Sequence, residues 1–172
     1  MSGGNAIAGT SCAGSSTIGP GNSAVACGYF DTASGGGSVA MGYGNVASSQ
    51  FGSALGVNNN ATASDSSAVG YGNNANNTDA TAFGYKNIAS GSKSAAFGYK
   101  NIASLSNDSA FGYGNTASGT SDGNASAFGF DNQATGDRSS AVGSHNIVSG
   151  QSAAHLVTST PCPEPRAARW AS

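Results

Sequence analysis

Small and large side chains alternate along this chain in short stretches that recur every fourteen residues. Residues 96–99, for example, read Ala, Phe, Gly, Tyr, and most copies keep this order of small and large. A period of two places successive side chains on opposite faces of a β-strand, whereas a helix would need spacings of three and four. The many glycines, serines and asparagines would also weaken a helix. The pattern therefore predicts an all-β protein with a strand in each copy.

The copies are marked by a column of glycines. Their fourteen-residue spacing holds from Gly28 to Gly112 and resumes, after seventeen residues, at Gly129. Alanine stands two residues before every one of these glycines, and asparagine or aspartate stands three residues after it. The unit reads A-x-G-x-x-[ND]-x-A-[ST]-x5, and the copies at residues 82–90 and 96–104 are identical. Self-similarity at a short fixed period is typical of solenoids.

Fourteen residues suffice for two short strands and two tight turns, which make one coil of a parallel β-roll. Stacked coils rise about 4.8 Å each, the spacing of paired strands. So short a coil encloses a narrow interior, and we expect only Ala, Gly and Ser to point inward. Each asparagine amide is expected to bond to the amides of the coils above and below, and asparagine also tolerates left-handed turn dihedrals. The residues assigned to this structural ladder are Gly42, Gly56, Gly70, Gly84, Gly98, Gly112, Asn45, Asn73, Asn87 and Asn101.

Large residues flank the glycines and are expected to point outward. An apolar stripe of this length is too large to leave in water, so we expect it to pack against other copies of the chain. A second column, mostly tyrosine, follows the glycines from Tyr29 to Phe130. The residues predicted at the interface between copies precede the glycines: Met41, Leu55, Val69, Phe83, Phe97, Phe111, Phe128 and Val142.

The repeats divide the chain into three parts. Residues 1–21 carry a blurred copy and are expected to form a degenerate first coil or cap. Residues 22–155 form the repeat domain, in which three extra residues within 118–125 predict a surface loop. Residues 156–172 lose the period and contain several prolines, so they are expected to be an irregular tail.

Composition and motifs argue against nucleic-acid binding, membrane insertion, metal or redox sites and cofactor binding. Only 8 % of the residues are charged and the net charge is −2, with no basic stripe for nucleic acid. Neither a signal peptide nor an apolar run long enough for a membrane anchor is visible. The three cysteines lack metal or redox spacing, and Cys27 is interpreted as a small buried hydrophobe. The G-x-G-x-x-A strings lack the helix that a dinucleotide site requires, so no cofactor is expected.

The remaining polar residues suggest surface roles. His145 and His155 have no acidic or nucleophilic partner at a recurring place, so no catalytic site is expected. The aspartates between units, Asp65, Asp79, Asp108, Asp122 and Asp137, are interpreted as turn residues. Lys86 and Lys100 stack one coil apart on one face, with Lys93 across the roll. These lysines are either a solvated surface or a site for an acidic ligand.

The motif S-x-A-x-G followed by x-x-x-x-A resembles the head repeats of trimeric autotransporter adhesins of the YadA type. It is present as Ser38-Val39-Ala40-Met41-Gly42 and as residues 66–70, and the resemblance covers about residues 22–150. It implies a left-handed β-roll, a side-by-side homotrimer and a non-enzymatic adhesin on the bacterial cell surface. The implied partners are collagen or other matrix proteins and host cells, without nucleic acid or direct membrane insertion. Since the family's export segment, neck, stalk and membrane barrel are not seen, the alternative is a structural or receptor-binding segment of a bacteriophage tail fibre.

Overall fold

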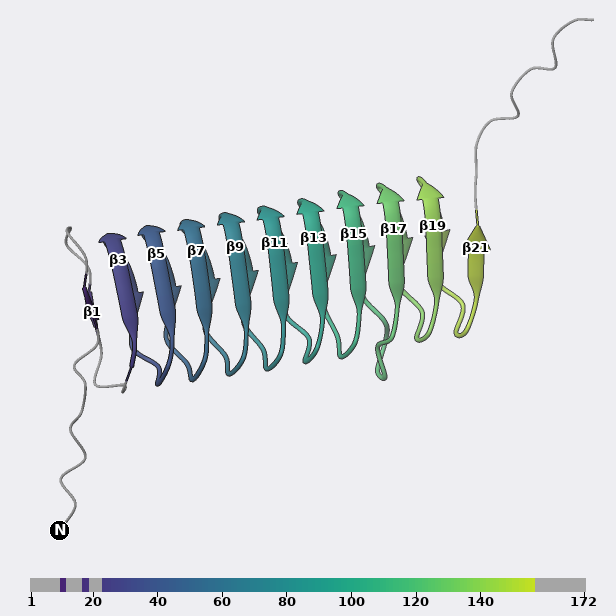
Figure 1. Cartoon of the computed structure of the whole chain (residues 1–172). Helices are drawn as coiled ribbons and strands as arrows, with labels where there is room; N and C mark the ends of the chain where they lie inside the picture. Colours follow the sequence, from purple (N-terminus) through teal and green to yellow (C-terminus); the bar gives the residue numbers. More distant parts are fainter. Residues whose placement is uncertain (1–9, 12–16, 19–22, 157–172) are drawn as a thin grey trace, which may run out of the picture.

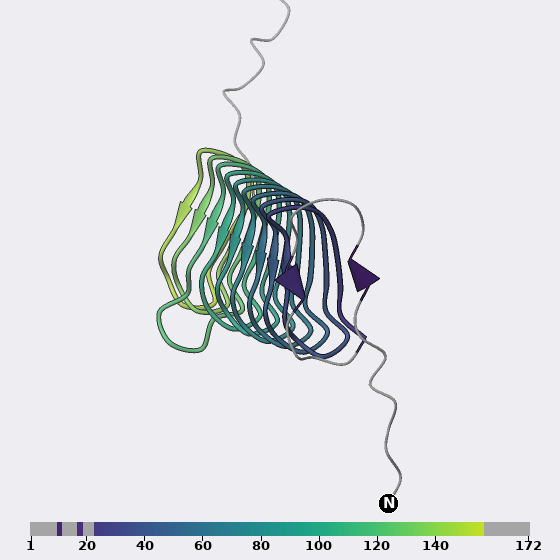
Figure 2. The ribbon, with the colours of Figure 1, turned by 90° about the vertical axis from the view of Figure 1, so that its left-hand side faces the viewer.

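The chain forms a parallel β-solenoid in which each coil contributes one long and one short strand (Figure 1). The structure is a computed structural model and describes residues 10–11, 17–18 and 23–156. Its coils stack along one axis, and a second view shows outlines of similar shape, each displaced from the one before (Figure 2). The all-β fold and the coil of about 14 residues predicted from the sequence are confirmed.

The long strands form an 11-stranded parallel sheet. Ala82 pairs with Ala96 fourteen residues on, whereas Ala110 pairs with Ala127, seventeen residues on, because the extra residues lie between them. The strands of this sheet, in spatial order, are β1 (Thr10–Ser11), β3 (Val25–Tyr29), β5 (Val39–Tyr43), β7 (Ser53–Val57), β9 (Ser67–Tyr71), β11 (Thr81–Tyr85), β13 (Ala95–Tyr99), β15 (Ser109–Tyr113), β17 (Ser126–Phe130), β19 (Ser140–Ser144) and β21 (Ala154–Leu156).

The short strands form a second parallel sheet of 10 strands. Each has an outward residue followed by an inward one, which is alanine in most coils. The strands in spatial order are β2 (Thr17–Ile18), β4 (Thr32–Ala33), β6 (Val46–Ala47), β8 (Asn60–Ala61), β10 (Asn74–Ala75), β12 (Ile88–Ala89), β14 (Ile102–Ala103), β16 (Thr116–Ala117), β18 (Gln133–Ala134) and β20 (Ile147–Val148).

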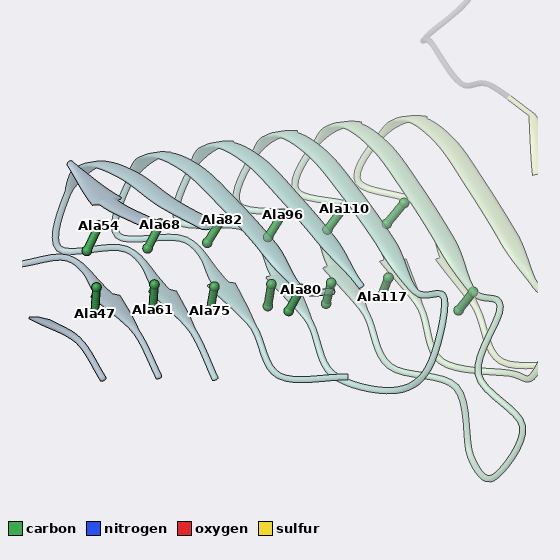
Figure 3. Close-up of a cluster of buried hydrophobic side chains, with 14 of the residues drawn as sticks. Ala47, Ala54, Ala61, Ala68, Ala75, Ala80, Ala82, Ala96, Ala110 and Ala117 are labelled. Carbon is green, nitrogen blue, oxygen red and sulfur yellow. The ribbon is translucent and has the colours of Figure 1, made fainter. Parts of the chain in front are cut away.

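The interior between the two sheets is lined by alanine. In the described part of the chain, every buried hydrophobic residue is alanine except Val148. Figure 3 shows one alanine row on the long strands, with Ala54 and Ala68, and another on the short strands, with Ala47 and Ala61. A methyl group from each sheet fills the gap, so a larger side chain would have to push the sheets apart.

Alanine, glycine and serine are not the only interior residues, contrary to the prediction. The largest fully buried side chains are the asparagines of the ladder, such as Asn45 and Asn73, together with Asp31 and Asp108. They lie where the chain leaves the long strand or enters it, and there the coil is wide enough for an amide. A polar group can be buried at these places because its hydrogen bonds are made within the protein.

Each coil turns at two corners, and at each corner one residue has a positive φ. The ladder asparagines themselves do not take left-handed dihedrals. The residue before the asparagine does so instead, as Lys86 (φ 53°) does before Asn87, which lets the asparagine point inward. We call this turn the first corner; its residues are Phe30, Gly44, Asn58, Gly72, Lys86, Lys100, Gly114, Asp131 and His145. The second corner, between a short strand and the next long strand, holds Ser23, Gly37, Phe51, Asp65, Asp79, Lys93, Asn107, Asn124, Arg138 and Ser152.

The ends of the array differ slightly from the predicted boundaries. Four residues of the segment 1–21 are described, and they form β1 and β2, which pair in parallel with β3 and β4. At the other end, β21 pairs with β19 and runs to Leu156, across the predicted boundary at residue 155. The rest of the predicted cap and of the tail lies outside the described residues. Residues 118–125 contain no strand and project from the second corner as a loop (Figure 2).

Candidate functional site

The buried asparagines are joined by a continuous chain of side-chain hydrogen bonds. The backbone N–H and the Nδ2 of Asn87 both donate to Oδ1 of Asn73, each at 3.0 Å. The same Nδ2 also donates to the carbonyls of Phe83 at 2.9 Å and Gly98 at 2.8 Å. The Oδ1 of Asn87 accepts in turn from Asn101. Each amide therefore ties together three consecutive coils, and this network fixes the position of the first corner.

The sequence predicts that the ladder glycines line the interior, and this prediction is wrong. In the structure these glycines are half-buried or exposed. Glycine is required at these positions because the backbone has a positive φ and because the next coil lies very close along the solenoid axis. Gly84 has φ +119°, and a Cβ there would lie 2.1 Å from the carbonyl oxygen of Gly98 in the next coil. No side chain fits so close to a backbone oxygen. Glycine therefore lets the strands of adjacent coils pair in register through this position, as Gly84 does with Gly98.

The residues before the glycines form an outward apolar column on the long-strand sheet. Phe83 is 50 % exposed, whereas Phe97 and Phe111 are half-buried by their stacked neighbours. The rings of Phe97 and Phe111 lie 4.9 Å apart and 2° from parallel, and Phe128 stacks 5.0 Å beyond Phe111. Stacking within one chain covers ring faces and leaves the outer edges bare. We call these residues, from Met41 to Val142, the phenylalanine column.

The residues after the glycines form a second column, here called the tyrosine column. Its stacked rings belong to Tyr71, Tyr85, Tyr99, Tyr113 and Phe130, with centroids 4.8 to 5.1 Å apart and planes within 11° of parallel. The repeat of the rings equals that of the paired strands. The solenoid thus exposes two parallel aromatic columns separated by the glycines.

Two lysines of the first corner lie against the tyrosine column. The Nζ of Lys86 lies 5.3 Å from the ring centroid of Tyr85, and that of Lys100 lies 5.2 Å from the ring centroid of Tyr99. An ammonium group at this distance is attracted by the face of the ring. Both lysines are exposed, and both have φ 53°. The two identical copies therefore repeat the same Tyr–Lys arrangement one coil apart.

The loop at residues 118–125 is organised by a carboxylate of the following coil. Oδ1 of Asp137 accepts hydrogen bonds from the backbone N–H groups of Thr120 (2.7 Å), Ser121 (2.9 Å), Asp122 (3.1 Å) and Gly123 (3.2 Å). Its Oδ2 accepts from the hydroxyls of Thr120 and Ser121. The backbone N–H of Ser121 is the main cause that holds the pKa of Asp137 well below its usual range, against the effect of burial. The loop tip is thus held in one conformation.

Comparison with protein families decides what kind of solenoid this is. The family model described as "YadA head domain repeat (2 copies)" matches residues 33–59, 47–73, 61–87, 75–101, 89–115 and 123–146. The first five matches overlap by about one coil each, the sixth follows the insertion, and together they cover more than half of the chain. The chain belongs to the YadA head repeat family. The resemblance inferred from the sequence is therefore confirmed, and the chain is an adhesin-like segment of this type.

Two further findings complete the comparison. No curated protein matches this YadA head. Within residues 10–11, 17–18 and 23–156, the structure contains no helix that could span a membrane.

Titratable groups of this YadA head do not gather into a reactive centre within the described ranges. No group of three His, Cys, Asp or Glu side chains there could hold a metal ion. His145 lies on the surface, where its Nδ1 is 2.7 Å from Oγ of Ser144 and its Nε2 is 3.8 Å from Oδ2 of Asp131. The His145 and Asp131 side chains are 65 % and 54 % exposed, so no enclosed site forms around them. The side chain of His155 lies outside the described residues.

One interpretation of a single residue from the sequence is wrong: Cys27, interpreted as a small buried hydrophobe, is half-buried and takes part in a disulfide. Asp65, Asp79 and Asp137 lie in turns of the second corner, and Asp108 closes the turn that begins at Leu105, as interpreted from the sequence. Asp108 and Asp137 are in addition buried hydrogen-bond acceptors, which the sequence did not predict; Asp108 accepts from the backbone N–H groups of Leu105 and Ala125. The signal for Asp137 was its position one coil after the insertion, where a longer loop leaves backbone N–H groups in need of acceptors.

Proposed function

We propose that this YadA head is a non-enzymatic, trimeric cell-surface adhesin head that binds extracellular matrix proteins, such as collagen, or other host-cell surface ligands. In the proposed assembly the coils wind left-handed and three chains lie side by side. The phenylalanine column, from Met41 to Val142, packs between them. The observation that carries the proposal is the pair of long apolar columns that a single chain leaves exposed.

Burial energetics support the assembly. A core made of alanine removes little apolar surface per residue, so the chain alone gains little from hydrophobic burial. Exposed rings such as Phe83 and Phe128 supply the missing area if other chains cover them. Three chains would also present three copies of every surface feature, which raises the avidity of weak contacts.

Oligomeric state tests the proposed assembly. Light scattering on the purified protein is expected to give three times the chain mass of 16.6 kDa. Phe97→Asp should dissociate or unfold the trimer, because it would bury a carboxylate between apolar rings. Ile88→Asp is the matched control, since Ile88 is an exposed apolar residue on the other sheet. A stable wild-type monomer, or an intact Phe97→Asp trimer, would refute this interface.

A binding panel tests the adhesin function. The trimer is expected to bind to immobilised matrix proteins or to host cells, while a heat-unfolded sample is not. Collagen, other matrix proteins and cultured cells should be compared at the same trimer concentration. Binding only to bacterial cells would favour the alternative of a bacteriophage tail-fibre segment and would contradict the adhesin proposal.

A further inference from the structure

We propose that the Tyr–Lys pairs at residues 85–86 and 99–100 form a binding site for a linear polyanionic polysaccharide. The inference rests on the proposed adhesin function and names a ligand class and a surface for it. Four side chains carry it, two rings and two ammonium groups in consecutive coils.

Each of the two ammonium groups lies close to the ring of the tyrosine before it. Each Nζ lies 5.2 to 5.3 Å from the centroid of the tyrosine that precedes it in the sequence. The rings of Tyr85 and Tyr99 are themselves stacked 4.9 Å apart with planes within 5°. Since the two coils have the same sequence and the same φ at Lys86 and Lys100, the ammonium groups repeat one coil apart. A lysine on a ring loses less rotamer freedom on binding than a free one.

This pair of positive charges has no negative partner among the described residues. The ion pair found there joins His145 to Asp131, farther along the same corner. The coils on either side of the lysines carry Gly72 and Gly114 at the same corner position, so no neighbouring charge compensates them. Two like charges one coil apart repel each other. A ligand with regularly spaced anionic groups would relieve this repulsion in the complex.

The arrangement of the rings favours a polysaccharide over a nucleic acid. Binding of single-stranded nucleic acid relies on ring faces on which bases stack. Here the faces of Tyr85 and Tyr99 are covered by neighbouring rings and by the lysines. What the column offers to a ligand is ring edges and phenol hydroxyls, which can donate to and accept from sugar hydroxyls. The straight column of repeated groups fits a linear chain.

Binding of the intact protein to immobilised heparin tests the inference, with hyaluronan as a carboxylated and dextran as an uncharged polysaccharide. We expect binding to heparin, weaker binding to hyaluronan and none to dextran, with affinity falling as salt rises. The variant K86N/K100N should lose about tenfold in affinity, the scale of two exposed charge contacts. Asparagine suits the positive φ, since Asn58 occupies the same corner with φ 53°. The matched control is K93N, because Lys93 lies at the second corner.

A gain of affinity separates this site from a loss of folding. Gly114 lies one coil beyond Lys100 with φ +67°, and a Cβ there would lie 3.8 Å from its nearest neighbour, Oδ1 of Asp131. G114K/D131N should place a third ammonium group at the ring of Tyr113 without a carboxylate beside it, and it should bind heparin more tightly than D131N alone. The variant Y85L/Y99L keeps both lysines but removes the rings that hold them, and it should weaken binding.

Several results would overturn the inference. Equal affinities of wild type and K86N/K100N would do so, as would an equal loss in K93N. Stronger binding to single-stranded DNA or polyglutamate than to heparin would assign the site to another class of polyanion and would also refute it. The oligomeric state and matrix binding of each variant are measured in parallel. If the variants remain trimeric and bind matrix proteins but heparin binding is unaffected by the lysines, this inference fails while the proposed adhesin function stands.

Discussion

The two faces of the long-strand sheet follow different rules. On the inner face each coil places an alanine, from Ala26 to Ala141, with 0 % exposure. On the outer face the next residue varies among Cys, Met, Leu, Val and Phe. The inner position faces a gap that only a methyl group fills, whereas the outer position contacts the same position in neighbouring coils, as Phe97 contacts Phe111, and no second sheet packs over it. The comparison teaches that the inner face specifies the coil and the outer face is free to specify contacts with other molecules.

The largest expected effect concerns close approach between coils rather than either face. Gly84→Ala would place a Cβ 2.1 Å from the carbonyl oxygen of Gly98, so the strands would have to separate locally. We expect a loss of about 4 kcal/mol in the free energy of unfolding, measured by chemical denaturation. Gly114→Ala is the matched control: Gly114 also has a positive φ, but a Cβ there would make only ordinary contacts, the nearest at 3.8 Å, and the substitution should cost about 1 kcal/mol. Equal losses for the two would mean that φ alone requires glycine.

The second prediction concerns the substitution of one asparagine in the hydrogen-bonded ladder of buried amides. Asn73→Leu would leave the carbonyls of Val69 and Gly84 without their Nδ2 donor and would remove the acceptor for Asn87. We expect a loss of about 3 kcal/mol, since several buried polar groups lose partners. The adjacent Asn74→Leu faces outward, where other coils carry Ile88 or Ile102, and should change stability by less than about 0.5 kcal/mol. Thermal unfolding measures both variants. Similar losses of stability in Asn73→Leu and Asn74→Leu would mean that the hydrogen bonds of the buried asparagines contribute nothing specific.

The third test compares two adjacent alanines on opposite faces. Ala96→Val would add two methyl groups to the filled interior and should cost about 2 kcal/mol, because the sheets must move apart. Ala95→Val lies on the outer face, where Val25 and Val39 stand in other coils, and should be close to neutral. Similar unfolding midpoints for both variants would contradict the difference between the two faces.

The fourteen-residue periodicity was enough to predict the fold. It did not reveal why each recurring residue type is required at its position. Alternation around Ala96 predicted the strand, and the recurrence of asparagine suggested stacked amides. The glycines were misplaced because spacing alone carries no φ, and it is a positive φ and close approach to the next coil that require glycine. The left-handed position at the first corner was missed because Phe, Gly, Asn, Lys, Asp and His all occupy it. The position of Asp137 after the insertion was a signal, but its individual contacts could not be predicted, because its partners lie in the irregular stretch at residues 118–125 and depend on the path of that loop.

The smallest expected effect is local and concerns the one coil that departs from the regular array. Asp137→Asn keeps the size of the side chain but weakens acceptance from the N–H groups of residues 120–123, so amide hydrogen exchange there should accelerate while the alanine core stays protected. Because the pKa of Asp137 is lower in the folded chain than in the unfolded chain, its contribution to stability is present above about pH 4. It is lost as the pH falls through the folded pKa, where the carboxylate takes up a proton. The wild type should therefore lose more stability than Asp137→Asn between about pH 4 and pH 2, as judged by thermal unfolding. Parallel pH profiles for the two proteins would show that the loop is held by its backbone path and not by this carboxylate.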